Sequence, residues 1–376
     1  MKSTFYPAVI LCLFLMFFLP IASPAVASEN FATAKTLWSL NPDDLAKMGI
    51  EAKKITSVRF SGDGSKLIVL EHGFGGSCTF NVFDTKTGKL FGSHDVPVNL
   101  VSAFIPNIDG SKVFYVVDYG YSAQVIDFIS GRVRTFYTKE PNKGFRFMLP
   151  VSLFPGEDNS VTTGGYFLND SGMTEGDYLV TFDQVFNEGT TISRSLDIGK
   201  LLARAGGKGK VISIRCPENF KEAYYVVADD AESSKLFYAS MQDDKPAQLI
   251  DAGKGINFIF PDSKYETLFY CILYEDFSPM LVVFDRIAGK KKVIGEGLFT
   301  SPYLSKNEDT LFLGVIIEER FGQEMLIAKK ADGWKLLKLF IPGWQKSKDP
   351  CVYSLSPDGA TFCLWSEGNI MTGILP

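Results

Sequence analysis

A short turn signature recurs seven times along this chain of 376 residues and constrains its fold more than any other feature. Each copy ends an apolar run, and proline occupies the third position in five of the seven. Proline presets φ for a tight turn, and Asp, Asn or Gly tolerates the unusual backbone angles that follow. Repetition at intervals of 44 to 62 residues is typical of an array of similar units. The copies begin at Phe60, Phe104, Leu153, Arg215, Ile259, Leu304 and Leu355.

The runs that follow the signatures have the composition of β-strands. Residues 66–70, 112–117 and 267–273 are rich in β-branched and aromatic side chains and are too short for stable helices. A third run in each unit ends in a polar turn, as at residues 83–88, and a fourth short run leads to the next copy. Four strands per repeat are typical of propeller blades. We therefore expect an all-β fold, a seven-bladed β-propeller of four-stranded antiparallel blades.

The two ends of the sequence predict how such a ring would close. Only 22 residues run from Leu355 to the last residue, which is enough for three strands. A strand-like segment, residues 33–40, precedes the first signature. Because an unpaired blade edge would be open to association, we expect this N-terminal strand to complete the last blade. Residues 28–376 are predicted to form a single propeller domain.

Two segments interrupt the strand pattern. Residues 195–206 combine a capping Ser or Asp, a helix-forming middle and a terminal glycine, and residues 41–49 have a similar pattern. We expect a short helix in each segment, outside the blades.

The turn motif resembles that of a known group of propellers. The run Ser356, Pro357, Asp358, Gly359 and its degenerate copy at residues 60–64 resemble the motif of WD-repeat-like propellers in exported bacterial proteins. Examples are the propeller half of the Tol-system periplasmic protein and the quinoprotein amine dehydrogenase-like superfamily. The resemblance covers almost all of the chain after residue 27. It implies a fold and does not imply an activity.

The first 27 residues have the features of a secretory signal peptide. Lys2 supplies a positive charge, residues 8–21 form an apolar run of 14, and Ala25 and Ala27 are small residues that a signal peptidase recognises. The alternative is a membrane anchor, but this run is shorter than the roughly 20 residues needed to cross a bilayer. We expect cleavage after Ala27, export to the periplasm or the outside of the cell, and no membrane span in the exported chain.

Five cysteines remain after this cleavage, so at least one thiol is free or pairs between chains. Cys351 and Cys363 flank a predicted hairpin turn and lie within reach of a cross-strand disulfide. Two buried, unbridged cysteines are the favoured alternative.

Composition and missing motifs argue against several function classes. A net charge of −5 disfavours a general nucleic-acid binder, which needs a basic face. Only two histidines, His72 and His94, leave little room for His-rich metal sites or a His-based triad. The sequence has no Gly-x-Ser-x-Gly, His-Glu-x-x-His or phosphate-loop motif. The sequence therefore favours a binding protein over an enzyme.

In a propeller, the links between second and third strands gather on one face around the central channel. Here these links carry thirteen acidic side chains against one base, Arg320, with aromatic residues interleaved, whereas the opposite turns are rich in Lys and Arg. We predict an acidic, aromatic-containing loop face. Its residues are Glu71, Phe74, Asp118, Tyr119, Tyr121, Asp170, Glu175, Asp177, Asp229, Asp230, Glu232, Tyr274, Glu275, Asp276, Phe277, Glu318, Glu319, Phe321 and Glu367.

Such a face has more than one use. It can bind a protein or peptide partner through a basic patch, or acids such as Asp229, Asp230 and Glu232 can bind Ca²⁺, although no EF-hand-like spacing is present. The same acids can also serve only solubility. We favour an exported binding or scaffold propeller. The alternative is a propeller enzyme, a lactonase-like hydrolase or quinoprotein-like dehydrogenase, with a carboxylate-bound metal at the channel mouth.

Overall fold

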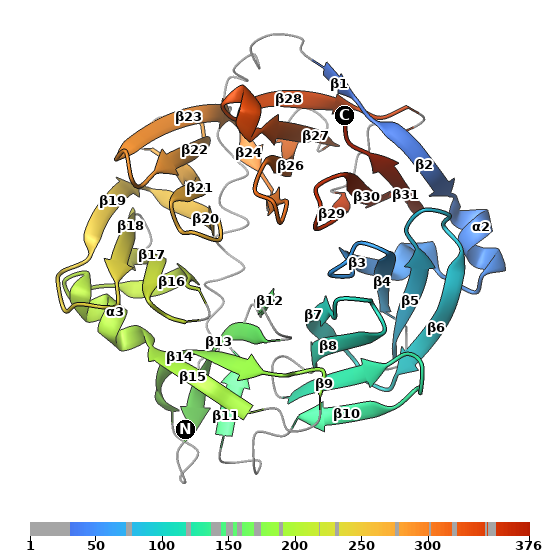
Figure 1. Ribbon diagram of the computed structural model, residues 1–376, viewed down its shortest axis with the longest axis horizontal. Coiled ribbons are helices and arrows are strands. Elements are labelled where there is room, and N and C mark those ends of the chain that lie inside the picture. The colour runs from blue at the N-terminus through green and yellow to red at the C-terminus, as the bar shows by residue number, and fades with distance from the viewer. Residues whose placement is uncertain are drawn as a thin grey trace, which may run out of the picture.

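The chain folds into a ring of seven β-sheets around a central axis (Figure 1). In most of the sheets the first strand lies nearest the axis and the last strand lies at the rim. The prediction of a seven-bladed, all-β propeller is confirmed. The computed structural model describes residues 31–72, 77–117, 122–136, 144–147, 153–155, 160–168, 174–187, 191–217, 219–229, 233–274, 278–300, 302–317, 322–342, 344 and 351–376.

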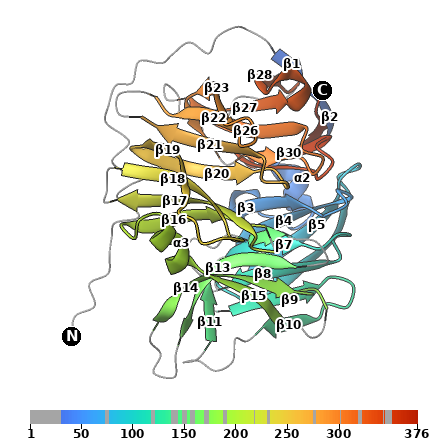
Figure 2. The same cartoon turned by 60° about the vertical axis from the view of Figure 1, so that its left-hand side comes forward.

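Blades 1, 2, 4 and 5 are four-stranded antiparallel sheets whose strands follow one another in the chain. Figure 2 shows the strands of blades 4 and 5 above one another at the side of the ring. Blade 1 contains β3 (Ile55–Phe60), β4 (Lys66–His72), β5 (Cys78–Asp84) and β6 (Leu90–Val96), and blade 2 contains β7 (Val101–Pro106), β8 (Lys112–Val117), β9 (Ser122–Asp127) and β10 (Val133–Phe136). Blade 4 contains β16 (Lys210–Arg215), β17 (Glu222–Asp229), β18 (Ser233–Ser240) and β19 (Gln248–Gly253), and blade 5 contains β20 (Gly255–Pro261), β21 (Thr267–Leu273), β22 (Met280–Asp285) and β23 (Lys290–Glu296).

Blades 3 and 6 differ from the others because their inner strand is split into two short pieces that pair with the same second strand. Blade 3 contains β11 (Gly144–Phe147), β12 (Leu153–Pro155), β13 (Val161–Leu168), β14 (Thr174–Asp183) and β15 (Thr191–Asp197). Blade 6 contains β24 (Leu298–Phe299), β25 (Tyr303–Leu304), β26 (Thr310–Ile317), β27 (Gly322–Lys329) and β28 (Lys335–Phe340).

Blade 7 is built from both ends of the described chain. Strands β29 (Val352–Leu355), β30 (Thr361–Ser366) and β31 (Asn369–Ile374) are completed by the N-terminal strand β2 (Lys35–Leu40), which pairs antiparallel with β31. The predicted closure of the last blade is confirmed. The structure adds a second contact, because β1 (Phe31–Thr33) pairs in parallel with the outer strand of blade 6 before the chain crosses to blade 7.

The core lies between the blades. Seven buried apolar clusters occur among the described residues, one at each boundary between neighbouring blades. Each sheet therefore has a neighbouring blade on both of its faces. This explains why the sequences of the second strands are continuous apolar runs. In β4, the side chains of Leu67, Ile68 and Val69 have no exposed surface. Between blades 1 and 2, the Phe80 ring lies edge-on to Tyr115 with 5.3 Å between centroids.

The two expected helices are present. Helix α2 (Pro42–Lys47) begins after Asn41, whose side chain accepts hydrogen bonds from the first-turn amides, and α3 (Ile198–Arg204) begins after Asp197, which caps Gly199. Short 3₁₀ turns, η2 (Ala52–Lys54) and η7 (Lys330–Asp332), complete the regular structure. Within the described ranges, no helix is long and apolar enough to cross a membrane.

The five cysteines of the described chain are buried free thiols. Cys363 lies opposite Ser354 in the β29–β30 pair, and Cys351 precedes β29, so the two predicted partners are not opposite each other. The favoured expectation of two buried, unbridged cysteines is confirmed.

Candidate functional site

Strand alternation divides the connections of the ring between two faces. We call the face that carries the turns between first and second strands and between third and fourth strands the turn face, and the face that carries the links between second and third strands the loop face. First turns of neighbouring blades touch on the turn face: the Gly62 amide donates to the Asn107 carbonyl at 3.1 Å, and the Lys306 amide donates to the Pro357 carbonyl at 2.6 Å. The loop-face links lie at the opposite ends of the same strands.

The repeated signature is explained by bonds within the first turns that the structure describes. In blade 2, the Asp109 carboxylate accepts hydrogen bonds from the Ser111 hydroxyl at 2.7 Å and the Ser111 amide at 3.0 Å, and the Asn107 side chain accepts from the Lys112 amide at 2.9 Å. The Ser111 hydroxyl is the main cause of the lowered pKa of Asp109, because it stabilises the charged form against partial burial. The acid of the signature is thus engaged in its own turn.

Five of the predicted loop-face residues lie in the part of the chain whose side chains are described: Glu71, Asp177, Asp229, Tyr274 and Glu367. Glu175 belongs to β14, and only its backbone is described. The remaining assignments lie outside the described residues: Phe74, Asp118, Tyr119, Tyr121, Asp170, Asp230, Glu232, Glu275, Asp276, Phe277, Glu318, Glu319 and Phe321.

Glu71 is turned into the protein. Its side chain is 8% exposed and accepts hydrogen bonds from the Glu51 amide at 3.2 Å and from the Asn81 amide group at 3.3 Å. Burial raises the pKa of this carboxyl, and the two hydrogen bonds offset the rise only in part. Glu71 therefore fastens the segment before β3 to blade 1 and presents little charge to a partner.

The other described loop-face residues differ in how much of their polar surface is already engaged. Asp229 is half-buried and forms an ion pair with Lys235 at 2.6 Å, whereas Asp177 and Glu367 are exposed. Glu367 has a φ of 49° and precedes Gly368 in the tight link between β30 and β31. A non-glycine residue in this region is uncommon, so the turn holds the backbone of Glu367 in a defined conformation.

Tyr274 belongs to a polar cluster between blades 4 and 5 that the sequence reasoning missed. The Asp251 carboxylate, 8% exposed, accepts hydrogen bonds from the hydroxyls of Tyr270 at 2.6 Å and Tyr274 at 2.9 Å, and Lys291 lies 3.0 Å away. Burial, together with the bond to the Asp251 carboxylate, raises the pKa of Tyr274 to about 12. The cluster joins the outer strand of blade 4 to three positions of blade 5, and no local pattern in the sequence announces it.

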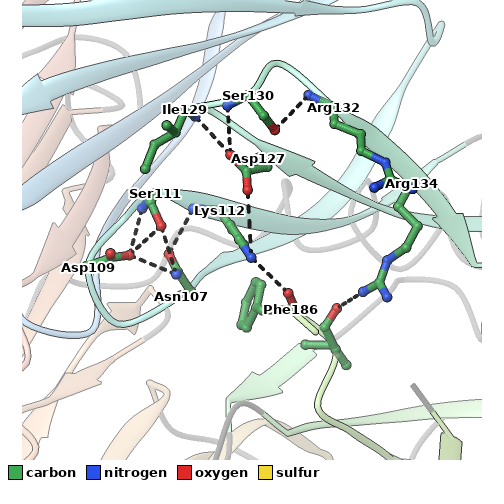
Figure 3. Close-up of polar contacts among 11 residues, drawn as sticks. Asn107, Asp109, Ser111, Lys112, Asp127, Ile129, Ser130, Arg132, Arg134 and Phe186 are labelled. Carbon is green, nitrogen blue, oxygen red and sulfur yellow. Dashed lines mark hydrogen bonds and ion pairs between the residues drawn. The ribbon is translucent and has the colours of Figure 1, made fainter. Parts of the chain in front are cut away.

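Basic residues of the turn face also join blades. From blade 2, Lys112 Nζ donates to the Phe186 carbonyl at 3.2 Å and Arg134 donates to the Val185 carbonyl at 2.8 Å, so both cations hold the third-to-fourth turn of blade 3 (Figure 3). Lys112 also lies 3.7 Å from Asp127. Arg134 belongs to the basic turns that the sequence predicts, whereas Lys112 is the first residue of β8, and both cations join neighbouring blades.

Metal-binding groups and surface depressions are the other places where a ligand could bind. Among the residues that the structure describes, no group of three or more His, Cys, Asp or Glu side chains could hold a metal ion. A depression on the rim beside the β1–β2 junction is lined by Ala34, Lys35, Thr36, Ser39, Pro342 and Met371.

Comparison with known proteins places the fold but no activity. No protein-family model matches the chain, and no curated protein matches it. The propeller domain of Myceliophteria thermophila Cps50 (Swd1) is 12% identical, with a TM-score of 0.52 over 85% of this chain and 96% of that chain. A chain of the Mitotic Checkpoint Complex is 12% identical, with a TM-score of 0.54 over 100% of this chain and 98% of that chain.

Kuenenia stuttgartiensis hydrazine synthase is also similar in fold, at 12% identity and a TM-score of 0.52 over 85% of this chain and 95% of that chain. At this identity the likeness shows the fold alone, because the same fold carries many unrelated functions. The fold-level resemblance expected from the turn motif is confirmed. In architecture, the chain is a seven-bladed β-propeller similar to WD40 propellers.

Proposed function

We propose that the protein is an exported binding propeller whose loop face engages a basic patch on a protein or peptide partner. The acids of this face come from separate blades, so their charges would act on an extended partner surface and not on one small ligand. Export rests on the signal-like features of residues 1–27, with cleavage after Ala27.

One observation carries the proposal. Asp177, in the loop-face half of β14 in blade 3, and Glu367, in the link between β30 and β31 of blade 7, are both exposed. They lie on different blades of a closed ring, so a partner that pairs with both must lie across the face. A structural neighbour from the Mitotic Checkpoint Complex, which belongs to an assembly of proteins, supports a role of this kind.

The test uses charge reversal on the loop face. A fluorescent peptide of alternating Lys and Tyr residues serves as the probe, and its anisotropy is followed with wild-type protein and with the double variant Asp177→Lys, Glu367→Lys. We expect the double variant to bind about tenfold more weakly, because two attractive charges become repulsive. The binding of the wild-type protein should also weaken as salt is raised, since exposed charges are screened.

The matched control is Asp332→Lys, which reverses an exposed acid in the turn η7 on the opposite face. Equal affinity of wild type and double variant, or an equal loss in the control, would overturn the proposal. A calcium titration of melting temperature tests the alternative metal site. A rise of several degrees at micromolar Ca²⁺ would favour that site through linkage of binding to folding.

A further inference from the structure

Three exposed apolar side chains lie on the turn face where blade 1 meets blade 2. Ile129 is 86% exposed, Ile108 is 62% exposed and Phe91 is 55% exposed. The two turns of blade 2 that carry the isoleucines are joined, because the Phe128 amide donates to the Ser111 carbonyl at 2.8 Å. Single exposed apolar residues are common on proteins, whereas several at one boundary mark a contact surface.

Comparison of equivalent positions in different blades shows what is unusual where blade 1 meets blade 2. The seventh residue after the aspartate that begins each third-to-fourth turn is Arg134 in blade 2, Lys292 in blade 5 and Phe91 in blade 1. Arg134 donates to the Val185 carbonyl of blade 3, and Lys292 donates to the Gly333 carbonyl of blade 6 at 2.8 Å. In both cases a cation holds the next blade. Phe91 cannot do so, and its ring stays exposed.

Lys66 differs from its equivalent in the same way. Lys112 occupies the first position of the second strand in blade 2, and its ammonium is engaged by the Phe186 carbonyl and by Asp127. Lys66 occupies that position in blade 1, and its Nζ lies over the Phe91 ring at 3.1 Å from the centroid. Among the described residues, the Lys66 ammonium forms no side-chain hydrogen bond, although its charge helps to lower the pKa of Asp84 on the neighbouring strand. The ammonium can still meet a carboxylate brought by a partner.

The lysines around the apolar side chains favour an acidic partner, because the acids beside them, Asp63, Asp109 and Asp127, accept hydrogen bonds within their own turns. Lys86 and Lys89 are exposed in the neighbouring turn of blade 1. The Asp84 carboxylate of that turn is engaged by the Lys86 amide at 3.1 Å and by the Thr87 amide and hydroxyl, each at 2.8 Å. The Thr87 hydroxyl bond is the largest cause of the lowered pKa of Asp84. The lysine side chains project from this turn, while its acid bonds inward.

We propose that this boundary of the turn face is a docking surface for an acidic peptide segment of a partner protein that also carries apolar side chains. The apolar side chains would cover Phe91, Ile108 and Ile129, and the carboxylates would meet the ammonium groups of the three lysines, Lys66, Lys86 and Lys89. The surface lies on the face opposite the predicted acidic loop face. The protein would thus hold two partners of opposite charge on its two faces.

The experiment selects binders from a displayed library of short random peptides. The immobilised protein is the chain from residue 28 to residue 376. We expect enriched peptides to contain Asp or Glu together with Leu, Ile or Phe. Each enriched peptide is then synthesised, and its affinity is measured by fluorescence anisotropy. The variant Ile129→Asp should weaken binding by about tenfold or more, because it replaces an apolar contact with a repelling charge. Lys66→Glu should weaken it similarly.

The matched control is Ile287→Asp, which changes an isoleucine at the same turn position of blade 5 that is 69% exposed. Its binding should equal that of the wild type, and melting temperatures verify that all variants are folded. Enrichment of peptides without acidic residues, no enrichment, or equal binding by wild type and Ile129→Asp would each overturn the inference. The inference would also be overturned if the enriched peptides bound Ile129→Asp normally and failed to bind only the double variant Asp177→Lys, Glu367→Lys. That result would leave the proposed function intact.

Discussion

Serine and aspartate recur in the turn signature because each bonds to backbone a few residues away. In blade 7, the Ser356 hydroxyl accepts from the Thr361 amide at 2.8 Å, and the Asp358 carboxylate accepts from the Ala360 amide at 3.0 Å. Such bonds depend on local sequence alone, so the pattern is readable without a structure. The role of Glu71 is not readable, because its partners Glu51 and Asn81 lie in other elements.

The raised pKa of Glu71 has a consequence for stability. Because the folded state raises this pKa, it holds the proton more tightly than the unfolded chain, and ionisation costs stability as the pH rises through the unfolded and then the folded value. Glu71→Gln removes the ionisation. We expect its unfolding free energy, relative to wild type, to increase between pH 4 and pH 7 in urea titrations. A difference between Glu71→Gln and wild type that stays constant over this pH range would contradict the expected effect of burial.

Gly314 is required by a buried polar network between blades 6 and 7. A Cβ atom at this position would lie 1.8 Å from Gln323 Nε2 and 2.7 Å from Thr300 Oγ1, and these two side chains bond to each other at 3.1 Å. Gly314→Ala should lower the unfolding free energy by about 2 to 3 kcal/mol, through overpacking and the loss of buried hydrogen bonds. Urea denaturation measures this loss. Gly255→Ala is the control, because a Cβ at Gly255 meets nothing within 4 Å.

At the scale of elements, the unpaired edges of the outer strands are protected from pairing with another chain in two ways. Strand β23 begins with three exposed lysines, Lys290 to Lys292, which discourage pairing with another chain. Strand β28 has three leucines among its six residues, and it is covered by β1. Composition therefore explains which edge is left open, but pairing of β1 with blade 6 could not be predicted from three residues.

Trp38 fastens the closing strand β2 to blade 1. Its indole NH donates to the Thr85 carbonyl at 2.8 Å, and its ring stacks on Phe83 with 6.1 Å between centroids. Trp38→Ala should cost about 3 kcal/mol of stability, and Trp38→Phe only about 1 kcal/mol, since the second variant keeps the ring and loses the hydrogen bond. Thermal and urea unfolding distinguish the two. Equal losses would show that the stacking contributes nothing.

For the whole molecule, closure depends on segments from the two ends of the described chain. Strand β2 pairs with β31, and the buried cluster between blades 6 and 7 contains residues from both segments, including Ala34 and Met371. Each blade packs only against its two neighbours, so the ring is closed only where β2 pairs with β31. The stability of the whole ring therefore depends on that pairing.

Truncation separates the two N-terminal contacts. A chain that begins at Ala34 lacks β1 but keeps β2, and it should keep the oligomeric state of the longer chain with a loss of about 1 to 2 kcal/mol in stability. A chain that begins at Asn41 also lacks β2, which leaves β31 as an unpaired edge, so it should associate or aggregate. Size-exclusion chromatography and melting temperatures measure both. A monomeric, stable chain from Asn41 onward would contradict closure by β2.

The sequence by itself determined the number of blades, the closing strand and the two capped helices. These features rest on local bonds, strand composition and repeat spacing, which are properties of neighbouring residues. Only the tertiary structure decided that Glu71 is buried, that Tyr274 is bonded to Asp251, and that basic side chains such as Lys112 bond to the next blade. Those outcomes depend on which surfaces of separate blades meet, and residues distant in sequence carry no local signal of that meeting.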